Sequence, residues 1–115
     1  MFELPDIMRV AQQMARHSGA RQVVLAENVA NADTPGYRAR DLPEFGAMLR
    51  AGTLDRAALE RAPVVDRNPV TRAPNGNTVS VEDQMMRAAQ TRQSHDLALA
   101  VYSSARNILR TALGK

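Results

Sequence analysis

The last third of the chain is the feature that most limits how this sequence can fold. From Val81 to Leu113 there is neither proline nor glycine, and residues suited to a helix seam recur at alternating spacings of four and three. The series is Val81, Met85, Ala88, Arg92, His95, Leu99, Tyr102, Arg106, Leu109 and Leu113. Ser80, followed by Glu82 and Asp83, has the form of a capping box. The pattern predicts one helix of 33 residues, about 50 Å long at ~1.5 Å per residue.

A second long helix is predicted at the other end of the chain. Pro5 and Asp6 suit a helix start, and no further proline occurs before Pro35. A seam with spacings of three and four runs through Met8, Ala11, Ala15, Ser18, Gln22, Leu25, Val29 and Ala32. Small residues within it allow another helix to come close. We expect the two helices to pack antiparallel, with an interface assigned to Met8, Ala11, Leu25, Val29, Met85, Leu99, Tyr102 and Leu109.

The segment between the helices has a different character. Four of the six prolines and three of the six glycines lie between Leu42 and Thr78, and no long apolar period occurs there. Two short helices are predicted, at Glu44–Arg50 and at Leu54–Arg61, the second with Thr53 as its cap. Short extended pieces are predicted at Val64–Val65 and Val70–Thr71, and a turn follows at 74–77.

The sequence therefore predicts an all-α fold. Long N-terminal and C-terminal helices form an antiparallel, coiled-coil-like hairpin, joined by an irregular middle segment that contains proline and glycine. At 115 residues the length favours one domain. Its predicted parts are a helix over 1–32, a turn over 33–41, the irregular middle over 42–79 and a helix over 80–115.

Composition argues against several classes of function. Fourteen of the 15 basic residues are arginine, but they are spread among 12 acidic residues without a basic stripe or stacking aromatics, so nucleic-acid binding is not expected. His17 and His95 lack further ligands at metal spacing and are expected to be solvated or interfacial. Neither a glycine-rich phosphate loop nor a nucleophile with a base is found. We expect no enzyme activity, no small-molecule substrate and no cofactor.

The predicted C-terminal helix carries apolar residues on more than one face. A hairpin with so few large side chains is close to balance between burial, at roughly 25 cal/mol per Å², and backbone entropy, at about 1–2 kcal/mol per residue. We therefore expect the terminal helices to become fully ordered only among neighbouring subunits.

The stretch that ends the first helix offers amides and a turn. Asparagine is a poor residue inside a helix, so Asn28 and Asn31 are expected to bond backbone groups at the helix exit. Thr34 precedes a proline and leaves the helical region. Pro35 and Gly36 suit the central positions of a type II turn, in which the second residue has positive φ. Physical reasoning alone leaves open whether these residues are punctuation or a specific contact.

These residues carry a family resemblance. The run from Asn28 to Tyr37 resembles the signature of flagellar rod, hook and hook-associated axial proteins, an Asn-x-x-Asn-x-x-Thr-Pro-Gly-Tyr pattern at the end of an N-terminal helix. The continuation 38–42 and the entry 76–82 into the last helix are similar to those of proximal-rod proteins. The resemblance implies that Asn28, Asn31, Thr34, Pro35, Gly36 and Tyr37 form an assembly motif.

The resemblance also implies a role and partners. Such proteins are structural subunits of the basal body, in the periplasmic rod, whose terminal helices pair in the assembly. They contact other rod proteins, copies of themselves and the adapter between the rod and the membrane ring. They are exported by the type III apparatus without a cleaved signal, and motility requires them. The alternative is a small helical export chaperone or adapter, because long helices with apolar faces suit that class as well.

Overall fold

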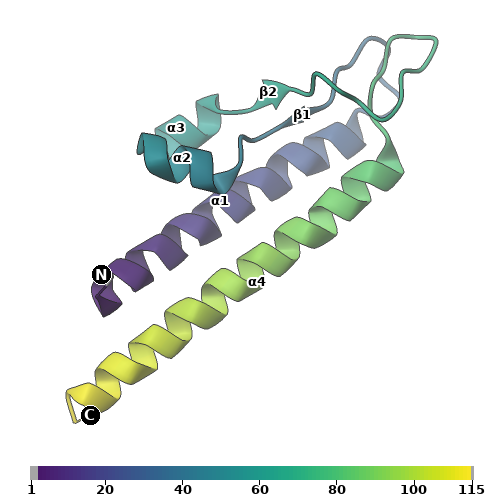
Figure 1. Cartoon of the computed structure of the whole chain (residues 1–115). Coiled ribbons are helices and arrows are strands. Elements are labelled where there is room, and N and C mark those ends of the chain that lie inside the picture. Colours follow the sequence, from purple (N-terminus) through teal and green to yellow (C-terminus); the bar gives the residue numbers. More distant parts are fainter. Residues whose placement is uncertain (1–2, 115) are drawn as a thin grey trace.

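The computed structural model describes residues 3–114, and its two long helices pack side by side. Helix α1 covers Leu4–Ala30 and helix α4 covers Val81–Ala112. They are antiparallel, with both chain ends at one end of a molecule of 63 × 25 × 20 Å (Figure 1). Positions 1, 2 and 115, at the outer ends of the predicted helical ranges, lie outside the described residues. Within residues 3–114 no helix is long and apolar enough to cross a membrane.

The middle segment folds back along α1, on the side away from α4 (Figure 1). It contains β1 (Arg40–Asp41), α2 (Phe45–Ala51), α3 (Arg56–Arg61) and β2 (Val64–Val65). The two strands pair antiparallel, with Arg40 opposite Val65 and Asp41 opposite Val64. The expectation of an all-α fold is therefore wrong in this detail. The strands are only two residues long, too short to leave an alternating pattern in the sequence.

The short helices lie close to their predicted positions, but one predicted cap is wrong. Helix α3 begins at Arg56, so Asp55 and not Thr53 occupies the capping position. The Thr53 hydroxyl donates to the Met48 carbonyl instead, at 3.4 Å, beyond the end of α2. The predicted extended piece at Val70–Thr71 is not a strand.

The main apolar core lies between α1 and the middle segment. Val24 of α1 packs against four buried residues of that segment, Leu42, Met48, Leu54 and Leu59. These four are five or six positions apart because the two short helices and the segments before them each contribute a single buried side chain. That spacing explains why the middle shows no long apolar period although it carries the core.

His17 extends this packing. It is buried, its Nε2 lies 2.8 Å from the Pro43 carbonyl oxygen, and its ring meets Phe45 edge to face at 5.7 Å. The expectation of a solvated or interfacial side chain is wrong for His17, because the folded-back middle segment covers this face of α1.

The seam between α1 and α4 has a seven-residue repeat. Its fully buried positions are Ala11, Ser18 and Leu25 on α1 and Gln84, Thr91, Ala98 and Ala105 on α4. Most are small or polar, and such residues let two helix backbones approach closely. Ser80 caps α4 through a 3.3 Å bond from the Asp83 N–H, which is half of the predicted capping box. Asp83 itself pairs with Arg87 instead of reaching back.

Candidate functional site

The signature residue Asn28 is fully buried and makes four hydrogen bonds. Its Nδ2 donates to the Arg40 carbonyl at 2.6 Å and to Gln84 Oε1 at 2.9 Å. Its Oδ1 accepts from the Tyr37 hydroxyl at 3.0 Å and from the Arg40 N–H at 3.1 Å. One amide thus uses two donors and two acceptor positions, its whole capacity. It joins α1, β1 and α4.

The bonds to Arg40 explain why an amide is needed here. In an antiparallel pair the backbone groups of successive residues point alternately toward the partner strand and away from it. The N–H and C=O of Arg40 point away from β2, and the Asn28 side chain bonds both of them. Asn28 therefore occupies the inner edge of the two-stranded sheet as another strand would, which neither aspartate nor an apolar residue can do.

The rest of the signature builds the turn. Asn31 Nδ2 donates to the Glu27 carbonyl at 2.9 Å, and Asn31 Oδ1 accepts from the Thr34 hydroxyl at 3.1 Å. The Tyr37 N–H bonds the Thr34 carbonyl at 3.2 Å, which closes a turn around Pro35 and Gly36. Gly36 has φ of 76°, as the predicted type II turn requires. Thr34, Pro35 and Gly36 are exposed.

A second loop, residues 73–79, is hydrogen-bonded to this turn. Asn77 is buried, and its Nδ2 donates to the Asn31 carbonyl at 2.9 Å and the Thr34 carbonyl at 2.7 Å. The Gly36 N–H bonds the Asn75 carbonyl at 2.9 Å. Sequence reasoning recognised a turn at 74–77 but did not assign Asn77 to the site. The signal was present, since this loop and the signature turn must meet at the same end of an antiparallel hairpin.

Five charged residues tie the middle segment to both long helices, and sequence reasoning missed them. Arg21 of α1 binds Asp41 of β1 through two bonds of 2.8 and 2.9 Å. Arg87 of α4 contacts Asp41, Asp66 and Asp83 at 3.1, 3.0 and 2.9 Å. All five side chains are largely buried. The i,i+4 spacing of Asp83 and Arg87 on α4 could have suggested their ion pair. Arg21, Asp41 and Asp66 are far from them in sequence, so no spacing rule could add these three.

The electrostatics of this cluster favour the charged forms. Burial alone raises the pKa of Asp41, but the hydrogen bond and charge of Arg21, the Leu42 N–H and the charge of Arg87 outweigh it, so the pKa is lowered from 3.8. Burial alone lowers the pKa of Arg87, but its bond to Asp66 and the charges of Asp83, Asp41 and Asp66 outweigh this effect, so the pKa is raised above its ordinary value. The cluster is a structural clamp. Within residues 3–114 no group of acidic, histidine or cysteine side chains is arranged to hold a metal ion.

The eight residues assigned to helix packing divide into two groups. Ala11 and Leu25 are buried in the seam, and Met8, Tyr102 and Leu109 are half-buried. Val29, Met85 and Leu99 are 42%, 65% and 51% exposed, so their assignment to the α1–α4 seam is wrong.

The physical reason for this error is the register of α4. The prediction followed the larger apolar side chains at Met85 and Leu99, whereas the seam uses Gln84 and Ala98, each one position earlier. One residue rotates a position by about 100° around the helix axis. The polar side chain of Gln84 can be buried in the seam because its Oε1 accepts a hydrogen bond from Asn28 Nδ2.

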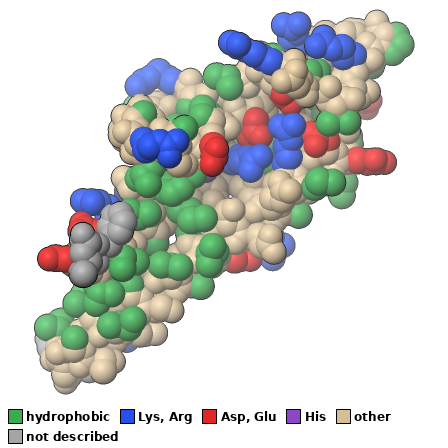
Figure 2. Space-filling model, viewed as in Figure 1, with side chains coloured by type: hydrophobic (Ala, Val, Ile, Leu, Met, Phe, Trp, Pro, Cys, Tyr) green, Lys and Arg blue, Asp and Glu red, His purple; other side chains and the backbone are tan. Residues whose placement is uncertain are grey.

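Apolar side chains also remain exposed near the chain ends. Leu97, Val101 and Ile108 on α4 are 56%, 38% and 56% exposed. Together with Ile7 and Val10 of α1 they border apolar hollows between the two helices. Figure 2 shows hydrophobic side chains along this part of the molecule, below the level of the middle segment.

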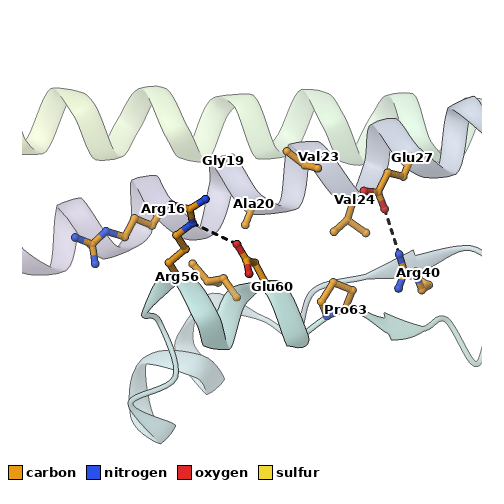
Figure 3. Close-up of a pocket in the computed structure, with 11 residues that line it drawn as sticks. Arg16, Gly19, Ala20, Val23, Val24, Glu27, Arg40, Arg56, Glu60 and Pro63 are labelled. Atoms are coloured by element: carbon orange, nitrogen blue, oxygen red, sulfur yellow. Dashed lines mark hydrogen bonds and ion pairs between the residues drawn. The ribbon is translucent and has the colours of Figure 1, made fainter.

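A groove of about 610 Å³ lies between α1 and α3 (Figure 3). Ala20, Val24 and Leu59 provide apolar walls. The charged residues at its rim include two ion pairs, Arg56–Glu60 and Arg40–Glu27, at 3.2 and 3.1 Å. The groove therefore has mixed character, without a concentration of one charge or of catalytic groups.

Part of the chain matches a known protein family. A family profile described as "Flagella basal body rod protein" matches residues 9–38, which span most of α1 and the signature turn. Over these residues the chain is similar to the class of flagellar basal body rod proteins.

Relatives that cover most of the chain identify the family within that class. The flagellar basal body rod protein FlgB of Cereibacter sphaeroides is 35% identical over 81% of this chain and 82% of its own length. FlgB of Salmonella typhimurium is 31% identical over 88% of both chains, and FlgB of Agrobacterium fabrum is 26% identical over 86% of both. The chain belongs to the FlgB family.

Proposed function

We propose that this chain is a non-enzymatic structural subunit of the proximal rod of the bacterial flagellar basal body. It acts as one rod domain, with its terminal helices in the assembly. Its partners are other rod proteins, further copies of itself and the adapter between the rod and the membrane ring. It reaches the periplasmic rod through the type III export apparatus without a cleaved signal, and the cell requires it for motility.

The observation that carries this proposal is the apolar surface near the chain ends. Leu97, Val101 and Ile108 form a row on α4 that α1 leaves exposed. Contiguous exposed apolar surface is typical of a protein–protein interface. A rod subunit has neighbours along this surface, and its family relatives are named as rod proteins. An exposed apolar surface suits an export chaperone or adapter as well, and the relatives named as rod proteins are what favour the rod subunit.

We propose two different roles for the signature residues. Asn28 is buried and acts through the fold, because it fixes the positions of α1, β1 and α4. Thr34, Pro35 and Gly36 are exposed at the end of the hairpin opposite the chain termini and contact a neighbouring subunit. Val29, Met85 and Leu99 are exposed apolar residues and are proposed as further contacts between subunits.

The test is complementation of a deletion strain. Leu97→Glu places a charge in the apolar row, and Gln93→Glu, exposed one turn earlier on α4, is the matched control. We expect Leu97→Glu to be synthesised and secreted but absent from purified basal bodies, with swimming lost, whereas Gln93→Glu supports both. Normal motility of the deletion strain would refute the proposed role. Normal incorporation of Leu97→Glu would refute the proposed interface.

A further inference from the structure

The outer edge of the small sheet is open. Val64 and Val65 form β2 and are 56% and 42% exposed. Exposed β-branched residues on an unpaired strand edge are a template for the addition of another strand. This edge lies on the middle segment, away from the apolar row of α4.

The pairing pattern shows which backbone groups are free. The Asp66 N–H bonds the Ala39 carbonyl at 2.9 Å, and residues 41 and 64 are opposite each other. The backbone groups of Val65 and of Arg40 opposite it therefore point away from the ladder. Asn28 satisfies those of Arg40. For Val65 no such partner is found among residues 3–114, so the sheet is closed at one edge and open at the other.

Unpaired arginines lie close in sequence to the two strands. Arg61 precedes β2, Arg67 follows it, and Arg38 lies next to the neighbouring strand. All three are exposed, and none forms an ion pair within the described part of the chain. Their nearest acidic neighbours in sequence are bound to other arginines, Glu60 to Arg56 and both Asp41 and Asp66 to Arg87. Figure 2 shows basic side chains gathered at the end of the molecule that carries the loops.

We propose that the β2 edge binds an extended segment of a partner protein by strand addition. The segment carries β-branched residues between flanking carboxylates. Its backbone pairs with Val65, and its carboxylates lie against Arg61 and Arg67. A second copy of β2 does not fit this role, because antiparallel pairing of two such edges brings Arg61 of one copy close to Arg67 of the other.

The edge is short, which limits its affinity. Pro63 has no N–H to donate, and the Asp66 carboxylate bends the chain by accepting from the Asn68 N–H at 3.0 Å. Only Val65 and the Pro63 carbonyl are available to an added strand. The contact is weak alone and contributes among the many contacts of an assembly.

Nuclear magnetic resonance with two capped peptides tests the proposal on the whole isolated chain. The probes are Glu-Glu-Val-Thr-Val-Glu and the same peptide with lysine at each glutamate position, at millimolar concentration. We expect the acidic peptide to shift the Val65 and Arg67 amide signals saturably. The basic peptide should bind about tenfold more weakly, given two lost ion pairs and two like-charge contacts. Equal effects of both peptides, or none at Val65, would overturn the proposal.

Three variants make the test specific for the edge. Val65→Pro removes the free N–H without touching the ladder, so acidic-peptide shifts at Arg67 should disappear, whereas Val65→Thr keeps them. Unchanged Ala39 and Arg40 signals report an intact sheet. Arg67→Glu, at an exposed position, should reverse the preference between the peptides. Undiminished binding to Val65→Pro, or an unchanged preference in Arg67→Glu, would contradict strand addition. These measurements involve neither export nor motility, so their failure is distinct from failure of the rod role.

Discussion

Replacing Asn28 is the sharpest perturbation of the signature, because its side chain is completely buried and fully bonded. Asn28→Ala leaves the Arg40 N–H, the Arg40 carbonyl and Gln84 Oε1 without partners, whereas the Tyr37 hydroxyl can turn toward water. Each buried polar group left without a hydrogen-bond partner costs about 1 kcal/mol or more, so we expect a loss of about 3 kcal/mol in the free energy of unfolding.

The matched control is Asn31→Ala. Asn31 has the same side chain one turn later, but its bonds to Glu27 and Thr34 are exposed. Water replaces them, so we expect a loss of about 0.5 kcal/mol. Asn28→Asp should be at least as harmful as Asn28→Ala, because it directs a carboxylate oxygen at the Arg40 carbonyl and at Gln84.

Urea unfolding followed by circular dichroism measures these differences, and amide hydrogen exchange locates them. The Arg40 amide exchanges when the structure opens globally or locally around it. A loss of about 3 kcal/mol in the free energy of that opening corresponds to roughly hundredfold faster exchange. Asn28→Ala and Asn31→Ala variants of equal stability would refute the argument that the first asparagine replaces a strand.

Three further outcomes follow from the same geometry. Gly36→Val should lower the free energy of unfolding by about 1–2 kcal/mol. The loss comes from backbone strain at positive φ alone, since a Cβ at this position meets no atom within 4 Å. An unchanged urea midpoint would contradict this prediction. Met48→Ala should cost about 2–3 kcal/mol in the same assay, because Met48 lies in the core that the middle segment forms with α1. Because the pKa of Asp41 is lowered in the folded chain, its ion pairs contribute fully to the free energy of unfolding above pH 4. This contribution is lost as the pH falls through the lowered pKa of Asp41, while Arg87 stays charged throughout. Asp41→Asn should therefore lose about 2 kcal/mol at pH 7, and the difference from the unaltered chain should shrink below pH 4; a constant difference would argue against the clamp.

The sequence predicted the long helices well because their evidence is local. Seam periodicity, Ser80 at the cap and the absence of proline from Val81 to Leu113 all act within one helix. The turn at Pro35 and Gly36 was predictable for the same reason, since positive φ at its second position selects glycine.

What the sequence did not predict depends on pairs of distant residues. The clamp joins Arg21, Asp41 and Arg87, and Asn77 meets the signature turn, only after the chain has folded back. The register of α4 was misjudged because size suggested Leu99 for the seam, where close approach of the helices requires Ala98. Local patterns report on single elements, and these contacts are between elements.

The two ends of α4 make contacts of different strength with the rest of the molecule. We therefore predict that local stability decreases along the helix. Near the loops, Gln84 bonds Asn28, Arg87 joins the clamp, and the Gln22 amide donates to the Ala88 carbonyl at 3.1 Å. Farther along, the seam is built from Ala98 and Ala105, each burying little more than one methyl group at about 0.8 kcal/mol.

We therefore expect hydrogen exchange in the isolated chain to be at least tenfold faster at residues 98–106 than at residues 84–92, because the first stretch opens without breaking a buried polar contact. The proposed interface covers the exposed row at Leu97, Val101 and Ile108 in assembled rods, so on this proposal the gradient should flatten there. Uniform exchange along α4 in the isolated chain would show that the alanine seam holds the helices as firmly as the clamp. A gradient that persists in the rod would place the apolar row outside the subunit interfaces.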